Sequence, residues 1–361
     1  MTDLSLFQSG AALAAAGSHG CPAHMTYLEA GVVGIIQGVT ELFPVSSLGH
    51  NVLLPALVGG CWERDLNVAA SESPYLAYIV GLHVATAIAL LIYFWRDWIR
   101  IIGGFFASLG HIVRPAPGTR RWQAQTVDQK MAWMIILATI PVGLVGLVFE
   151  HAFRVFFGKP IRAAIFLAIN GLILFAGERF RRKQSLQADQ EIAREREMVA
   201  AGTQRRSGGA RHAAGHQAER AAELAEGIEA DRRLASRGYV DALLIGTSQV
   251  LALLAGISRD GVAMVSGMFR GLSREDAARF AFLLATPVIL AAGVLKIPDL
   301  FGPLGNGIHG QVLFGSLLSG VGAYLSVRFL MKYFQTRTLT PFAIYCLVVG
   351  VGSIVYLGII K

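Results

Sequence analysis

The stretch 41–50 gathers reactive side chains inside otherwise apolar sequence. It supplies one carboxylate, two hydroxyls and one imidazole, from Glu41, Ser46, Ser47 and His50. Pro44 and Gly49 interrupt the backbone at the same place. Within a bilayer, ionisable groups and broken backbone are tolerated only where protein buries them or where they line a polar cavity. The stretch is therefore predicted to form an active site or a permeation site.

A second polar stretch runs from Gly256 to Gly261 and contains Ser258, Arg259 and Asp260. The planar fork of donors on an arginine suits phosphate better than the point charge of a lysine does. Glycines on both sides of it let backbone N–H groups approach an anion closely. If the two stretches meet, Arg259 faces an acid, a hydroxyl nucleophile and an imidazole, and this set suits phosphoryl transfer.

The elements that must position these residues are membrane helices. Of the 361 residues, 54% are hydrophobic, and several runs reach the ~20 apolar residues that cross a bilayer. The expected crossings are Tyr75–Trp95, Met131–Glu150, Ile161–Ala176, Ala277–Leu295, Gln311–Leu330 and Pro341–Ile360. The net charge of +8 resides mainly in loops, so it sets orientation and does not indicate nucleic-acid binding.

Most basic residues fall on one side of the expected crossings, which the positive-inside rule makes cytoplasmic. The apolar segments 27–58 and 239–269 remain unassigned. A single crossing by either would put the following basic loops on the wrong side. Each also has its break in the middle, at 44–49 and 256–261. Both segments are therefore predicted to be re-entrant hairpins, the first from outside and the second from the cytoplasm.

The predicted fold is an all-α integral membrane protein with six transmembrane helices and two re-entrant helical hairpins in an inverted-topology repeat. Such repeats place their broken helices face to face near the midplane. One membrane domain, 25–361, follows an N-terminal extension, 1–24. It divides into a first repeat, 25–180, a hydrophilic and solvated cytoplasmic insertion, 184–237, and a second repeat, 238–361. The cysteines at 21, 61 and 346 are odd in number and scattered, so we expect neither a disulfide framework nor a zinc site.

The two polar stretches resemble the signatures of a known family. Gln37-Gly-Val-Thr-Glu41 with Pro44-Val-Ser-Ser-Leu-Gly-His50 is similar to the first signature of undecaprenyl-diphosphatases of the bacitracin-resistance type. Ala255-Gly-Ile-Ser-Arg-Asp-Gly261 is similar to the second. The resemblance implies a multi-pass enzyme of the bacterial inner membrane, opening to the periplasmic face. It would hydrolyse undecaprenyl diphosphate to undecaprenyl phosphate and inorganic phosphate, recycling the lipid carrier of cell-wall synthesis with the help of a divalent cation.

The same resemblance implies a role for each matching residue. Ser47 is the expected nucleophile, with Ser46 as the alternative; His50 activates the serine or protonates the leaving group. Arg259 holds the diphosphate, with Ser46, Ser258, Gly256 and Gly261 also binding substrate. Glu41 acts as a base or as a ligand of Mg²⁺ or Ca²⁺, together with Gln37 and Asp260. Asp260 replaces the serine of the family signature, so it either binds the cation or pairs with Arg259.

A rival hypothesis is a membrane transporter or lipid flippase, because inverted repeats with facing broken helices are also a transporter architecture. A carrier needs substrate contacts but no nucleophile, so the serines beside Glu41 favour the enzyme. The expected partners are the polyprenyl diphosphate lipid and the membrane. Homodimerisation stays open at this stage.

Overall fold

The computed structural model describes residues 21, 25–68, 74–113, 124, 126–157, 159–200 and 227–360. Within these ranges the chain is helical and forms no strand. The elements in chain order are α2 (Tyr27–Thr40), α3 (Ser47–Val58), α4 (Gly60–Asp65), α5 (Pro74–Tyr93), α6 (Trp95–Val113), α7 (Val127–Phe157), α8 (Pro160–Ala200), α10 (Tyr239–Ser248), η1 (Gln249–Leu253), α11 (Arg259–Phe269), α12 (Arg274–Phe301), η2 (Pro303–Gly305), α13 (His309–Thr336), α14 (Thr340–Val355) and η3 (Tyr356–Ile360).

In the described part of the chain, six helices are long and apolar enough to cross a membrane. These are α5, α7, α8, α12, α13 and α14, and each overlaps one of the crossings predicted from sequence over most of its length, so the prediction of six helices able to span the membrane is confirmed. The sequence reasoning missed α6, which it took as part of a basic loop. Its exposed apolar residues Ile99, Ile102 and Phe106 share one face. The charged residues 96, 97 and 100 leave no uncharged run long enough to cross a bilayer.

Two pairs of short helices carry the polar stretches. The pair α2–α3 is interrupted at residues 41–46, and α10–α11 is interrupted by η1 and the following residues 254–258. The four helices have 14, 12, 10 and 11 residues. At ~1.5 Å per residue, each is too short to cross a ~30 Å hydrocarbon layer. The first break contains Ser46 at φ 69°, and the second contains Gly256 at φ 111°, a backbone region that glycine adopts most easily.

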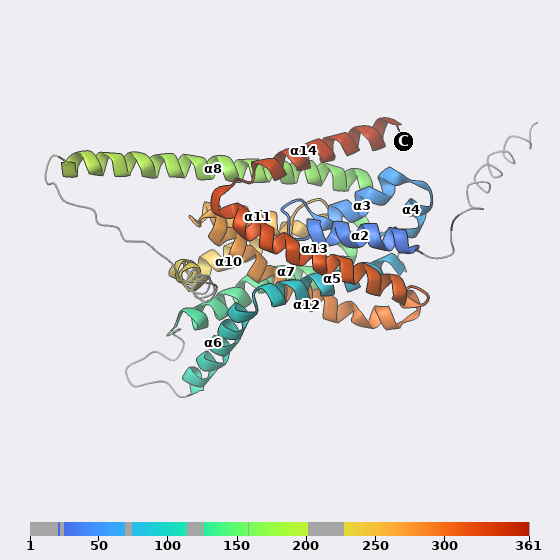
Figure 1. Cartoon of the computed structure of the whole chain (residues 1–361), viewed down its shortest axis with the longest axis horizontal. Helices are drawn as coiled ribbons and strands as arrows, with labels where there is room; N and C mark the ends of the chain where they lie inside the picture. Colours follow the sequence, from blue (N-terminus) through green and yellow to red (C-terminus); the bar gives the residue numbers. More distant parts are fainter. Residues whose placement is uncertain are drawn as a thin grey trace, which may run out of the picture.

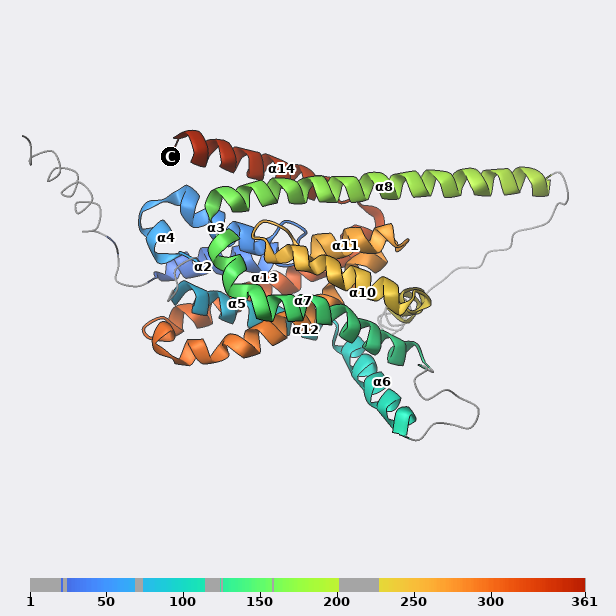
Figure 2. The ribbon, with the colours of Figure 1, turned by 180° about the vertical axis from the view of Figure 1, so that it is seen from behind.

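Each of these pairs packs against a long helix from the other half of the chain. On α2, a Cβ added at Gly34 would lie 2.6 Å from the carbonyl oxygen of Gly315 on α13. On α10, a Cβ at Gly246 would overlap the backbone of Ala138 on α7. Small residues allow such close helix approach in membranes. Helices α8 and α14 run side by side along one edge, while α6 projects from the opposite side (Figures 1 and 2).

A buried ionic cluster joins α6 and α12 to the helical residues 227–236. Asp231 has no exposed surface; it accepts hydrogen bonds from Arg100 at 2.6 Å and from Arg279 at 3.1 Å. Asp97 lies 2.6 Å from Arg100 and 3.0 Å from Arg279. The prediction that 184–237 is solvated is therefore wrong for its last residues, which these ion pairs connect to α6 and α12. Residues 201–226 of that insertion, and most of the extension 1–24, lie outside the described residues.

Cys21 and Cys61 form a disulfide across 40 residues of sequence, which corrects the prediction that the cysteines would not pair. The odd number is explained by Cys346, which is free and buried on α14. Pairing depends on which residues the fold brings together, and spacing along the chain does not reveal this.

Candidate active site

The breaks of the two helix pairs meet at a cavity of about 210 Å³. Its polar lining residues are Glu41, Ser46, Ser47, His83, Gln249, Ser258 and Arg259. Its apolar lining residues are Leu48, Val142, Ala252, Leu253, Ile257, Val288, Ile289 and Ala292. A water molecule occupies ~30 Å³ in the liquid, so the cavity has room for a group several times larger. A lining that contains both polar and aliphatic groups suits an amphipathic ligand.

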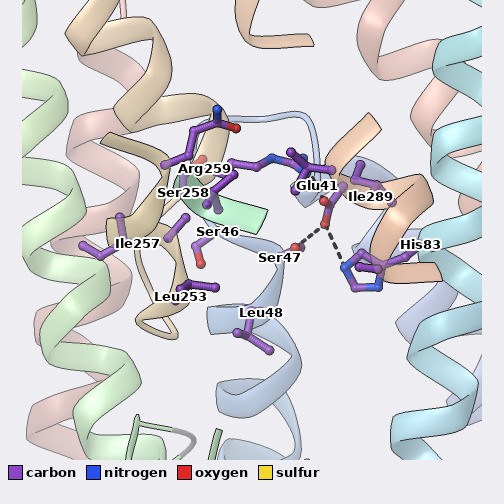
Figure 3. Close-up of a pocket in the computed structure, with 15 residues that line it drawn as sticks. Glu41, Ser46, Ser47, Leu48, His83, Leu253, Ile257, Ser258, Arg259 and Ile289 are labelled. Carbon is purple, nitrogen blue, oxygen red and sulfur yellow. Dashed lines mark hydrogen bonds and ion pairs between the residues drawn. The ribbon is translucent and has the colours of Figure 1, made fainter. Parts of the chain in front are cut away.

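Glu41 connects the polar groups of the lining, and Figure 3 shows its contacts with Ser47 and His83. Its Oε1 accepts a hydrogen bond from Nη2 of Arg259 at 3.0 Å, which joins the two helix pairs. Its Oε2 accepts from the Ser47 hydroxyl at 2.5 Å and from the Gln37 amide at 2.8 Å. Nε2 of His83 lies 3.5 Å from the same oxygen. A carboxylate this close to a serine hydroxyl can take up its proton.

The same local feature, a serine N-cap, positions both Ser47 and Arg259 at the cavity. Ser46 and Ser258 each occupy the residue before a helix, and their hydroxyls accept from the backbone N–H groups of Gly49 and Gly261 at 3.2 and 3.1 Å. Such N-caps satisfy N–H groups that have no partner within the helix. The next residue in each case begins the helix and bears the functional side chain. Because Ser46 is occupied as a cap, Ser47 is the better placed nucleophile of the two.

Asn170 on α8 ties the two breaks together. Its Nδ2 donates to the carbonyl oxygen of Pro44 at 2.9 Å, and its Oδ1 accepts from the backbone N–H of Ser258 at 3.0 Å. The side chain is fully buried. The first turn of α3 also packs directly on the second break, since a Cβ on Gly49 would lie 2.9 Å from Cα of Gly256. Asn170 therefore positions the residues that precede Ser47 and Arg259.

His50 lies away from the groups it was predicted to serve. Its Nδ1 lies 2.7 Å from the carbonyl oxygen of Ser46, and its Nε2 lies 2.8 Å from the hydroxyl of Tyr345 on α14. The two rings are stacked, and His50 does not line the cavity. The imidazole that reaches Glu41 is that of His83 on α5.

The predicted substrate-binding residues divide into two groups. Ser46, Ser258 and Arg259 line the cavity. Gly256 and Gly261 do not: the first packs against the backbone of α8, and the N–H of the second is used by the cap of α11. The two glycines therefore determine the backbone shape of the break, and the ligand contacts would come from the side chains.

The three predicted cation ligands do not form a preassembled metal site. Gln37 turns its NH₂ group towards Glu41, and its oxygen accepts from Asn51 at 2.6 Å. Asp260 is buried, with Oδ1 3.3 Å from Nε of Arg259 and Oδ2 without a partner. Among the described residues, no cluster of three or more His, Cys, Asp or Glu side chains could hold a metal. The contact with Arg259 supports the pairing alternative for Asp260.

Asn170, Asn51 and Gln249 were not among the site residues predicted from the sequence. All three are polar residues in apolar segments and are buried. A polar side chain within a membrane helix is costly enough to indicate a function or a partner. That signal was present in the sequence, but it does not identify the partner.

The fold and cavity define a multi-pass helical membrane protein with an internal polar site. The model of the family described as "Bacitracin resistance protein BacA" matches residues 30–205 and 212–352, so the chain belongs to this family. The resemblance inferred from the two motifs is thereby confirmed.

Similar proteins carry one name. The chain is 56% identical over 338 residues to the undecaprenyl-diphosphatase of Mycolicibacterium paratuberculosis, covering 93% of this chain and 99% of that protein. It is 52% identical over 342 residues to undecaprenyl-diphosphatase 2 of Frankia alni, with 90% and 96% covered. It is 36% identical over 320 residues to undecaprenyl-diphosphatase 2 of Burkholderia orbicola, with 88% and 92% covered.

Proposed function

We propose that this protein hydrolyses undecaprenyl diphosphate to undecaprenyl phosphate and inorganic phosphate. The observation that carries the proposal is the contact of Glu41 with both Ser47 and Arg259, which combines a nucleophile, a base and an anion-binding group in one cavity. Relatives that share almost the whole chain bear the name of this enzyme. The cellular consequence would be recycling of the lipid carrier of cell-wall synthesis, and with it bacitracin resistance.

In the proposed mechanism Glu41 removes the proton of Ser47 as Oγ attacks the terminal phosphorus. A bond forms between Oγ and phosphorus, and the bond from phosphorus to the bridging oxygen breaks. The proton on Glu41 passes to the departing undecaprenyl phosphate. Water then cleaves the phosphoserine, releasing inorganic phosphate and restoring the hydroxyl.

Arg259 stabilises the negative charge on the phosphoryl group. A guanidinium has five N–H donors, and the bonds to Glu41 and Asp260 use two of them. The remaining donors suit the oxygens of a diphosphate. Fixed donors of this kind contribute most in a site that excludes water.

A divalent cation is a further proposal. The protein offers few ligand oxygens for Mg²⁺ or Ca²⁺, so we infer that the cation would arrive bound to the substrate's phosphates, as Mg²⁺ commonly does. Phosphate release should then depend on Mg²⁺ or Ca²⁺ in the assay and stop with a chelator. Release that is unaffected by chelation would contradict this proposal.

We also propose that α2–α3 and α10–α11 are re-entrant hairpins related by an inverted repeat. In support, α2 packs on α13 as α10 packs on α7, and α5 pairs with α12 as α8 pairs with α14. The disulfide at α4 supports an outer location for that end, because disulfides persist in oxidising compartments. The basic α6 and residues 227–236 would then face the cytoplasm of the bacterial inner membrane, and the cavity would open to the periplasmic face.

The test is phosphate release from undecaprenyl diphosphate by purified protein in detergent. Ser47→Ala and Arg259→Ala should each abolish it. The control is Thr247→Val on α10, where the exposed hydroxyl bonds only its own helix; it should behave as wild type. A well-folded wild type that releases no phosphate would overturn the proposal and favour the transporter or flippase alternative, which needs no nucleophile.

A further inference from the structure

Gln249 is a buried amide without a hydrogen-bond partner at the wall of the cavity. It stands where α10 gives way to the 3₁₀ turn of the second break. The residue has no exposed surface. Neither its Nε2 nor its Oε1 has a partner, and the side chain lines the same cavity as Ser47 and Arg259.

Two other buried amides near the site, those of Gln37 and Asn170, have partners at both ends, and Asn51 lacks a partner only at its Oδ1. Gln37 bonds Glu41 and Asn51 through its two ends, and Asn170 bonds Pro44 and Ser258. A buried polar group left unpaired costs free energy, so nearly all find partners. An amide unsatisfied at both ends beside an active-site cavity therefore points to a ligand that supplies the missing bonds.

We propose that Gln249 binds the diphosphate of the substrate, which extends the function proposed above. Phosphate oxygens only accept hydrogen bonds, so the NH₂ group is the end that meets them. The carbonyl oxygen then accepts from a water that remains in the cavity. With Arg259 on the same helix pair, the second half of the chain supplies the substrate-binding groups, while the first half supplies Ser47 and Glu41.

A residue that binds the substrate and a residue that only maintains the fold respond differently to substitution. A structural amide would lower stability when replaced. Replacing an unpaired amide removes no hydrogen bond from the ligand-free protein. Gln249→Met, which is similar in length but apolar, should therefore unfold at the same temperature as wild type or higher. In contrast, its binding of diphosphate should weaken by about ten- to a hundred-fold, as expected for a lost hydrogen bond to a charged group.

The experiment compares wild type, Gln249→Met, Gln249→Glu and the control Thr247→Val in detergent. KM and kcat are measured with undecaprenyl diphosphate, and the thermal midpoint is measured with and without inorganic pyrophosphate. We expect Gln249→Met to raise KM and to lose the stabilisation by pyrophosphate. Gln249→Glu should lose more, because it keeps the shape and places a negative charge against the phosphate.

Either of two results overturns the assignment. One is a fall in the thermal midpoint of Gln249→Met without ligand, which indicates a structural role. The other is pyrophosphate protection and KM in both Gln249 variants equal to those of wild type. If the proposed function is wrong, wild type itself releases no phosphate, and this result differs from both of those outcomes. In that case the measurement with pyrophosphate still tests whether Gln249 binds a diphosphate.

Discussion

Asn170 offers a sharp test of how the site is held together. The substitution Asn170→Leu keeps a side chain of similar size but removes both hydrogen bonds to the breaks. It leaves the carbonyl oxygen of Pro44 and the N–H of Ser258 without this partner. Both lie in non-helical backbone, where no neighbouring turn of helix can replace the bond.

The expected loss follows from those two groups. The N–H of Ser258 would lose its side-chain partner, whereas the carbonyl of Pro44 would keep a weak contact from the Cys346 thiol at 3.9 Å. An unsatisfied buried backbone group costs ~1–3 kcal/mol, so the free energy of unfolding should fall by about 1–4 kcal/mol. Hydrogen bonds within membrane proteins often measure ~0.6 kcal/mol, which favours the lower end. Activity should fall more steeply than stability, because a ~1 Å misplacement of reacting groups can cost ~100-fold in rate.

The assay is unfolding by denaturant in detergent, together with phosphate release at a temperature where the variant stays folded. The control is Thr139→Val on α7, whose hydroxyl bonds only the carbonyl of Ile135 in its own helix; it should change stability by less than ~0.5 kcal/mol. Wild-type stability and wild-type activity in Asn170→Leu would refute the idea that this residue positions the two breaks.

Three further predictions use other features. Ser46→Gly should keep its activity and lose only a few tenths of a kcal/mol of stability, because glycine tolerates φ 69° and is a fair N-cap. Ser47→Ala, in contrast, should release phosphate ~1,000-fold or more slowly than wild type. Equal losses of activity in the two variants would contradict the assignment of Ser47 as the nucleophile. Asp231→Ala should lower the free energy of unfolding by ~3 kcal/mol, measured by denaturant, because the buried Arg279 would keep Asp97 as its one remaining carboxylate partner among the described residues. Arg100 would keep Asp97 and Asp128. An unchanged midpoint would contradict this prediction. Thiol titration of the unfolded chain should find one thiol, that of Cys346, before reduction and three after it; three beforehand would rule out the disulfide.

The sequence predicted the spans and much of the site because both leave local signals. A run of apolar residues identifies a crossing wherever its partners lie, and the six predicted spans were confirmed. The cluster around Glu41 was visible because its members are close in sequence. Arg259 was found because a guanidinium between glycines, inside an apolar segment, suits the binding of phosphate.

What could not be predicted depends on the rotation of helices and on distant partners. His50 is turned towards Tyr345, 295 residues away, and no local pattern reveals that contact. The sequence around Asn170 does not indicate which two backbone groups its side chain binds. The amphipathic α6 lacked the uninterrupted apolar run by which crossings were recognised.

The contact between Glu41 and Arg259 has a consequence for how the protein is made. The two residues are 218 positions apart, and α2 packs on α13, which lies later still. Glu41 and the short helices that flank it are therefore synthesised long before Arg259 and α13, their partners. The chain cannot acquire its site gradually: a product truncated before residue 259 would hold a nucleophile and a base, with neither the arginine nor the second set of short helices to complete them.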